Sequence, residues 1–298
     1  MGSRFEFIAV SGDSVSAKKS IQIGISEVRR LEQMISSWDD NSETSRINQN
    51  AGIMSVEVSP ELFGLIKRSK KVSVLTDGIF DISYASMDKI WKFDGSMTTF
   101  PDSSLVKESV AKINYQDIEL EPQSQSVFLR KKGMKIGFGG IGKGFAANVA
   151  SKKMRESGIE NGVVNAGGDL ISWGNQADGK PWQIAVTDPK DKKKTIGWLD
   201  ISNTAVVTSG NYEKFVEFNG QKYTHIINPK TGYPVFGTRS VTIICPDAEL
   251  ADALATSVFI LGEKKGLELI NTLKGIECFL ITDRDELKSS SGLQINYL

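Results

Sequence analysis

The segment Phe215-Val-Glu-Phe-Asn219-Gly220-Gln-Lys-Tyr-Thr-His225 decides which kind of sheet this chain of 298 residues builds. Apolar and polar residues alternate on both sides of an Asn-Gly pair, which favours the two-residue turn of a β-hairpin. Two strands joined in this way run antiparallel, whereas parallel strands need a long crossover connection. The segment therefore predicts a fold with antiparallel sheets.

The rest of the chain mixes strands and helices, and no break in composition marks a linker. Expected strands lie at residues 3–10, 118–129 (a hairpin), 134–138, 162–165, 182–187, 198–202, 205–208, 241–244 and 276–282. Expected helices lie at residues 21–38, 60–77, 104–113, from the glycine run described below to 158, after a cap at 247, and around 264–273. Residues 39–50 read as a polar loop. We therefore expect a single compact α+β unit with antiparallel sheets and packed helices, forming one domain over residues 1–298.

The composition excludes several classes of function. With 36 basic and 36 acidic residues, the chain has no electrostatic footprint for nucleic acid or an anionic membrane. Two cysteines and one histidine can build neither a four-cysteine nor a three-histidine zinc site. A metal would therefore be held mainly by oxygen, which points to magnesium or calcium.

The densest signal is the stretch GMKIGFGGIGKG from Gly133 to Gly144. Gly137, Gly139 and Gly142 match the dinucleotide fingerprint G-x-G-x-x-G, after an expected strand and before a helix. The run also falls short of a Walker A loop, because Gly144 stands where that loop has Ser or Thr. Glycines let backbone amides approach a ligand, and a helix N-terminus favours phosphate. We interpret the run as a phosphate-binding turn, with tight strand-to-helix packing as the alternative.

Two further turns of small residues are expected where strands end. They are Asn165-Ala-Gly167-Gly168-Asp169 and Thr208-Ser209-Gly210. Each alone is an ordinary turn, but three such turns within half of the chain indicate a binding cleft.

Asp252 and Thr256 stand four residues apart on an otherwise apolar predicted helix, so they share one face. An acid and a hydroxyl are costly on such a face unless they are paired or bind a cation. They are candidate metal ligands. The alternative is that Asp252 faces solvent in the first turn, where it suits the helix dipole.

His225 is the single histidine, so any catalysis that needs an imidazole must use it. It precedes the turn Asn228-Pro-Lys-Thr-Gly232, a rigid loop of the kind that positions ligands. A lone histidine in a strand is more often structural. Trp38, Trp91 and Phe80-Asp81 are candidates for stacking on a ligand, with burial in the core as the alternative.

Taken in order, several segments resemble the ApbE-type FAD:protein FMN transferases over nearly the whole chain. They are Met1–Phe5, Ser37–Asn48, Gly78–Asp81, Gly139–Gly144, Asn165–Asp169, Thr208–Gly210, His225–Gly232 and Ala251–Thr256. The order carries the resemblance, because each segment alone is weak. Two positions depart from the family pattern, since Gly137 and Asn228 stand where the family often has Asp.

The resemblance implies a T-fold-like α+β architecture that binds FAD in a cleft together with magnesium. The side chains of Asp252 and Thr256 and the carbonyl of Gly140 would be the magnesium ligands. The FAD site would be lined by Trp38, Ile79, Phe80, Asp81, Lys143 and Ile227, with Asn165, Gly167, Gly168, Asp169, Thr208, Ser209 and Gly210 alongside.

The implied reaction transfers FMN from FAD to a Ser or Thr hydroxyl of a partner protein and releases AMP. Cleavage of a pyrophosphate needs charge neutralisation and in-line positioning more than a covalent catalyst. Asp252 would hold the neutralising cation, and His225 would act as the base or orient the acceptor.

Three other functions are compatible with some of these residues. A magnesium-dependent FAD pyrophosphatase would release FMN and AMP from the same cleft. A nicotinamide-dependent oxidoreductase would follow from G-x-G-x-x-G and needs a six-stranded parallel sheet, against which the hairpin argues. A flavin-carrying protein without turnover would leave the metal residues idle.

The resemblance also implies a partner and a location. The acceptor would be a flavoprotein with a Ser/Thr flavinylation motif, such as a redox-pump subunit. The chain shows no Ser/Thr-Gly-Ala segment of the modified kind, so we expect no self-flavinylation. We expect an extracytoplasmic, periplasmic protein that meets the membrane only through a lipoprotein anchor upstream of Met1.

Overall fold

The computed structural model describes residues 2–87, 89–94, 96–97, 99–188, 191, 193–210, 215–218 and 221–298. The chain divides into two compact units, each made of separate stretches. The first unit comprises Met1–Leu31, Ile141–Gly210 and Thr238–Leu298, and the second comprises Glu32–Gly140 and Asn211–Gly237. The single domain over residues 1–298 stays a prediction, and each unit is described by itself.

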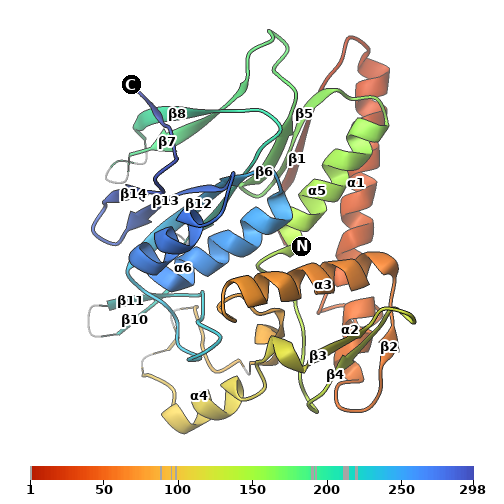
Figure 1. Ribbon diagram of the computed structural model, residues 1–298, viewed down its shortest axis with the longest axis vertical. Coiled ribbons are helices and arrows are strands. Elements are labelled where there is room, and N and C mark those ends of the chain that lie inside the picture. Colours follow the sequence, from red (N-terminus) through yellow and green to blue (C-terminus); the bar gives the residue numbers. More distant parts are fainter. Residues whose placement is uncertain are drawn as a thin grey trace. The chain divides into compact units, whose positions relative to one another are not determined.

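The first unit is built on a seven-stranded sheet whose neighbouring strands all pair antiparallel. Across the sheet, the strands are β1 (Phe5–Val10), β5 (Asn161–Ala166), β6 (Asp169–Trp173), β9 (Ala205–Gly210), β12 (Thr238–Cys245), β13 (Glu277–Thr282) and β14 (Leu287–Ser289). Helices α5 (Gly142–Glu156) and α6 (Ala248–Asn271) pack against this sheet and against each other (Figure 1). The expected antiparallel α+β fold is confirmed. A nicotinamide-dependent oxidoreductase would need a parallel sheet, so this alternative is wrong.

A smaller sheet in the same unit has the order β15 (Asn296–Tyr297), β8 (Thr195–Ile201), β7 (Trp182–Thr187). Its buried side chains, including Val186 and Leu199, form one apolar cluster with Val206 and Phe279 of the large sheet. Helix α1 (Ser14–Ile35) begins in this unit and ends in the second.

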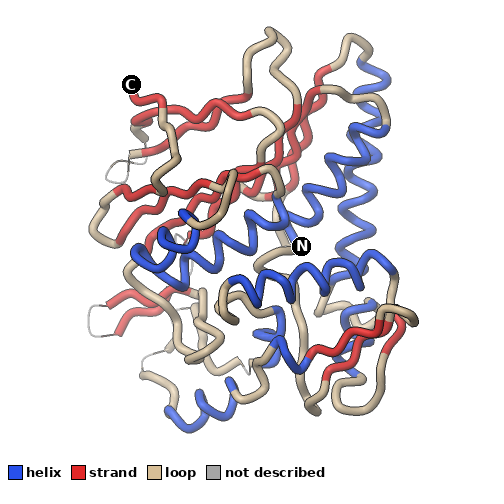
Figure 2. Tube along the Cα trace, viewed as in Figure 1, coloured by secondary structure: helices blue, strands red, loops and turns tan. Residues whose placement is uncertain are grey.

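The second unit is richer in short elements, as the tube in Figure 2 shows. Its helices are α2 (Glu43–Gln49), α3 (Pro60–Leu75), α4 (Ser103–Val110) and the 3-10 turns η1 (Ile82–Ser86) and η2 (Tyr115–Asp117). A three-stranded sheet has the order β2 (Val56–Glu57), β4 (Ser126–Leu129), β3 (Ile118–Glu121), and β10 (Phe215–Phe218) pairs with β11 (Gln221–Thr224). The pairing of β10 with β11 confirms the hairpin, while its Asn219-Gly220 turn lies outside the described residues. Within the described part of the chain, no helix is long and apolar enough to cross a membrane.

Two local expectations in the second unit are wrong. Residues 39–50 are not all loop, because the Ser42 hydroxyl accepts the amide of Ser45 and starts α2 as an N-cap. Residues 134–138 belong to no strand. Their backbone is held instead by side chains, because Asn48 bonds both the N–H and the C=O of Ile136 at 2.8 and 3.0 Å.

Helices α5 and α6 cap each other at their N-termini. The N-cap of α5 is the apolar Ile141, which offers no side-chain acceptor. Asp252 of α6 supplies one, since its Oδ2 accepts the amide of Gly144 at 3.0 Å. In return, Asn148 Oδ1 of α5 accepts the amide of Ala248 at 3.0 Å. Each helix thus satisfies amides that the other leaves without an intrahelical partner.

We predict that Gly144→Ala lowers the free energy of unfolding by about 2–3 kcal/mol through overpacking. A Cβ at this position would come within 3.0 Å of the Ala248 backbone and of Asp252 Cβ. Denaturation by urea measures the effect. Gly12→Ala is the matched control, because a Cβ at Gly12 meets nothing within 4 Å. Equal stability of the two variants would contradict the close α5–α6 contact.

Candidate active site

In the first unit, Lys143 extends from the first turn of α5 between two buried carboxylates. Its Nζ pairs with Asp169 Oδ2 and lies 3.9 Å from Asp252 Oδ1. Asp169 is 1% exposed and Asp252 is 2% exposed. Buried charges need compensation. One ammonium neutralises only one of the two carboxylates, so the group carries one excess negative charge when both are ionised. These three residues are called the Lys143 cluster below.

A tight turn between β5 and β6 places Asp169. Gly167 and Gly168 take positive φ values of 66° and 102°, as the central pair of a hairpin turn requires, and Asn165 Oδ1 accepts the amide of Gly168 at 2.8 Å. Asp169 then opens β6, and its Oδ1 accepts the amide of Thr208 in β9 at 3.3 Å. The predicted turn at residues 165–169 is therefore confirmed, and it delivers a carboxylate to the Lys143 cluster.

The residues Thr208, Ser209 and Gly210 do not form a turn. They are the last three residues of β9 and pair in register with Thr242, Val241 and Ser240 of β12. The hydroxyls of Thr208 and Thr242 lie 2.8 Å apart. Small residues after an expected strand are ambiguous in sequence. They can form a turn, or they can continue the strand when a partner strand lies alongside. Of these three residues, Thr208 is brought to the Lys143 cluster by its amide.

Asp252 and Thr256 lie one turn apart on α6, as the helical spacing predicts. Asp252 does not face solvent, so that alternative is wrong. Burial raises the pKa of the Asp252 carboxyl, against the pull of the Lys143 ammonium and of the backbone amides of Gly144 and Lys143. The carboxylate is therefore held in the interior by specific partners.

The oxygen donors of Asp252 and Thr256 fit magnesium. Asp252 Oδ2 is bonded to an amide, while its Oδ1 lies beyond hydrogen-bond distance from Lys143. A hard divalent cation at Asp252 and the Thr256 hydroxyl would offset the excess negative charge. Among the described residues no three His, Cys, Asp or Glu side chains gather as a metal site. Such a cation would thus depend on hydroxyl, backbone, water or phosphate oxygens, as magnesium often does.

In the second unit, Trp38 has the exposure of a residue that stacks on a ligand. It is 80% exposed, and Lys89 Nζ lies 4.5 Å from its ring centroid. Trp91 is the opposite case, since it is 7% exposed and its Nε1 donates to the carbonyl of Gly232 at 2.8 Å. Of the two candidates, only Trp38 presents its ring at the surface.

The segment Ile79–Asp81 follows α3 and is mostly buried. Phe80 lies in the core, and Ile79 is half-buried. Asp81 accepts from the amide and hydroxyl of Ser83 at 2.8 and 2.6 Å and from the amide of Tyr115 at 2.7 Å. Burial raises the pKa of the Asp81 carboxyl, which these hydrogen bonds oppose. Asp81 therefore fixes the local backbone.

Side chains hold the backbone at the start of the glycine run, at residues 135 and 136. Ser86 bonds both the N–H and the C=O of Lys135, at 2.8 and 2.9 Å. At the next residue, Ile136, Asn48 bonds the backbone in the same way. The amide of Gly137 then donates to the carbonyl of Ile82 at 2.9 Å. Ser86 carries no sequence signal for this role, and Asn48 was visible only as part of a family segment. Gly140 ends this unit, and its role as a metal ligand stays a prediction.

His225 is exposed and directly follows β11. Ile227 forms a β-bridge with Pro234, and Asn228 caps the turn between them, its Oδ1 accepting the amide of Lys230 at 2.9 Å. A carboxylate could accept the same bond, so the Asn at this position preserves the turn. Lys230 also pairs with Asp77 Oδ2 at 2.6 Å, which ties the turn to the end of α3.

Two other features carry none of the predicted site residues. Cys245 and Cys278 are buried free thiols, and burial raises their pKa to about 11 and about 12, so neither is a nucleophile near neutral pH.

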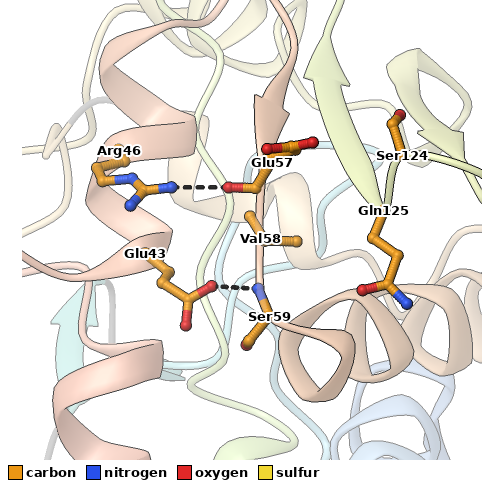
Figure 3. Close-up of a pocket in the computed structure, with 7 residues that line it drawn as sticks. All are labelled: Glu43, Arg46, Glu57, Val58, Ser59, Ser124 and Gln125. Atoms are coloured by element: carbon orange, nitrogen blue, oxygen red, sulfur yellow. Dashed lines mark hydrogen bonds between the residues drawn. The ribbon is translucent and has the colours of Figure 1, made fainter.

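A polar hollow of about 470 Å³ lies between α2 and the start of α3. There Glu43 accepts the amide of Ser59 and Arg46 donates to the carbonyl of Glu57 (Figure 3).

We predict that Lys143→Met lowers the free energy of unfolding by about 3 kcal/mol, because it leaves buried carboxylates without their cation. Lys152→Met on the same helix is the control, since that side chain is 76% exposed and pairs at 3.9 Å with Glu156. Chemical denaturation at neutral pH without divalent cations compares the two. A Lys143 variant as stable as the control would contradict the ion pairing in the Lys143 cluster.

Comparison with known proteins adds to this geometry. A sequence model of the ApbE family matches residues 1–280. A FAD:protein FMN transferase of Klebsiella pneumoniae (strain 342) is 29% identical over 299 residues, with 100% of this chain and 92% of that protein covered. Its counterpart in Escherichia coli (strain K12) is 28% identical over 285 residues, with 93% and 81% covered.

Solved structures agree. The apbe protein of Thermotoga maritima matches with a TM-score of 0.87 and 29% identity, covering 97% of this chain and 94% of that chain. Flavin transferase ApbE from Vibrio cholerae matches with a TM-score of 0.85, covering 98% and 94%, and at 24% identity it speaks to the fold alone. The expected ApbE-like α+β fold and the expected transferase class are confirmed. The chain belongs to the ApbE family.

Proposed function

We propose that this chain transfers FMN from FAD to a Ser or Thr hydroxyl of an acceptor protein and releases AMP, with magnesium as its cofactor. The observation that carries the proposal is the Lys143 cluster at the N-terminus of α5. The names of the Klebsiella and Escherichia relatives support flavin transfer to a protein.

The Lys143 cluster suits a pyrophosphate substrate. A helix N-terminus and a lysine side chain, here 28% exposed, both favour phosphate oxygens. Asp252 and Thr256 would hold magnesium, and the Gly140 carbonyl is the family's third ligand. When bound, the cation would neutralise the pyrophosphate and polarise the phosphoryl group under attack.

The bonds exchanged define what the residues must do. The acceptor oxygen bonds to the phosphorus of the FMN phosphate, the bond from that phosphorus to the AMP oxygen breaks, and the hydroxyl proton passes to a base. His225 is exposed and is the only imidazole in the chain, so we propose it as that base.

Incubation with FAD, MgCl2 and a flavoprotein acceptor containing a Ser/Thr flavinylation motif tests the function. We expect a fluorescent acceptor band after denaturing electrophoresis, a mass increase equal to one FMN, and release of AMP. Excess EDTA should abolish all three. Free FMN and AMP without a labelled acceptor would assign a pyrophosphatase instead. Tight FAD binding without turnover would assign a flavin carrier.

Asp252→Asn should lower the transfer rate at least 100-fold at low magnesium, because the amide lacks the charge that holds a cation. The Asn oxygen can still accept the Gly144 amide, so the fold should persist. Steady-state rates across a magnesium titration measure the change. Glu263→Gln on the same helix is the control, since Glu263 is 49% exposed. Full activity of Asp252→Asn with unchanged magnesium dependence would remove the metal assignment.

His225→Ala should slow transfer by about 10²–10⁴-fold, as expected for loss of a general base. Because the side chain is exposed, the thermal midpoint should not change. FAD affinity, measured without acceptor, should also stay near that of the parent enzyme, which separates chemistry from binding. A His225→Ala enzyme that labels its acceptor at the normal rate would show that His225 is not the general base.

We also propose an extracytoplasmic acceptor, with redox-pump subunits as candidates. This part of the proposal rests on the family resemblance. Mass spectrometry of flavoproteins encoded near this gene, after incubation with the enzyme and FAD, would identify the modified residue.

A further inference from the structure

Tyr84 lies beside Gly137 and Gly139 of the glycine run, although no sequence pattern singles it out. It is 44% exposed on η1, three residues after Asp81. A Cβ built on Gly139 would come within 3.0 Å of the Tyr84 Oη. A Cβ on Gly137 would lie 3.8 Å from the same oxygen and 3.0 Å from Ala85 Cβ. The phenol therefore occupies the space that a side chain at position 139 would need, and it lies within van der Waals contact of a side chain at position 137.

The backbone beneath this phenol is held on both sides. Asp81 caps η1 through Ser83, and the carbonyl of Ile82 accepts the amide of Gly137. Ser86, at the other end of η1, bonds the backbone of Lys135 in both directions. Tyr84 is thus attached to a fixed platform, and its position relative to the glycine run is set by hydrogen bonds.

Two residues with roles predicted from the sequence are near neighbours of this region in the chain. A Cβ on Gly137 would also lie 4.0 Å from the Ser37 Oγ, and Ser37 directly precedes the exposed ring of Trp38. Gly140 follows Gly139 in the chain. The Tyr84 hydroxyl therefore lies beside Gly139, one residue before the Gly140 carbonyl that the proposed function assigns to magnesium.

We propose that Tyr84 is a further FAD-binding residue of this enzyme, an inference that rests on the proposed function. Its ring packs beside the bound dinucleotide, and its hydroxyl, which can donate one hydrogen bond and accept others, contacts a polar group of FAD. The glycine at position 139 leaves room for this phenol. Beside position 137, where the ApbE family often has Asp, this enzyme thus has a neutral hydroxyl from another segment.

Equilibrium binding of FAD, followed by flavin fluorescence with EDTA present and no acceptor, tests the proposal. We expect Tyr84→Phe to raise the Kd about fivefold, because one neutral hydrogen bond is lost. Tyr84→Ala should raise it roughly thirtyfold, because the ring contact is lost as well. Tyr297→Ala is the matched control, since Tyr297 is 67% exposed and lies in β15 of the other unit.

Gly139→Ala provides an independent variant, because its methyl group should displace the phenol. It should raise the Kd about as much as Tyr84→Ala, and adding it to Tyr84→Ala should change the Kd less than twofold. An unchanged Kd in both Tyr84 variants, with the parent protein binding FAD, would overturn this proposal alone, as would fully additive effects of Gly139→Ala and Tyr84→Ala. A parent protein that neither binds FAD nor labels an acceptor would overturn the proposed function and this inference together.

Discussion

The hydrogen bond from the Gly144 amide to Asp252 sets the arrangement of the first unit around the Lys143 cluster. Helix α5 begins at an apolar N-cap, so its first amides need an acceptor from another element. Asp252 on α6 provides it, and the approach that this requires leaves no room for a side chain at Gly144. The residue before Gly144 is Lys143, which is thereby carried to Asp169 at the start of β6. One capping interaction thus fixes helix packing and the ion pairs together.

Asp252 has two carboxylate oxygens in different surroundings, which would let one carboxylate serve both its structural role and the proposed cation-binding role. Its Oδ2 is bonded to the helix, which anchors the group at a defined angle. Its Oδ1 lies 3.9 Å from Lys143, too far for a direct hydrogen bond. The excess negative charge of the Lys143 cluster raises the cost of folding without a cation, as burial raises the pKa of this carboxyl. Binding of the proposed cation would offset this cost and so stabilise the folded protein.

The sequence predicted correctly those elements whose structure depends on residues close together in the chain. The Asn-Gly hairpin, the helix that begins at Pro60 and the glycine turn before Asp169 depend on residues adjacent in the chain. Helix α2 was missed because seven residues are too short to show an apolar period, although its cap at Ser42 was readable. Residues 134–138 look like a strand, but their partners are the side chains of Asn48 and Ser86. Pairing of backbone with distant side chains leaves no periodic trace.

The glycine run shows most clearly why motif matching stops short of mechanism. Its fingerprint suggests one phosphate loop in which each glycine serves the ligand. The neighbours of individual glycines differ, however, because Gly144 makes room for the Ala248 backbone and Gly139 makes room for a phenol from η1. The helix start and Lys143 are the parts of the run whose chemistry suits phosphate directly. Gly139 and Gly144 are therefore best explained as positions where other parts of the chain approach the backbone closely, and a motif that records only glycines does not show which part approaches which position.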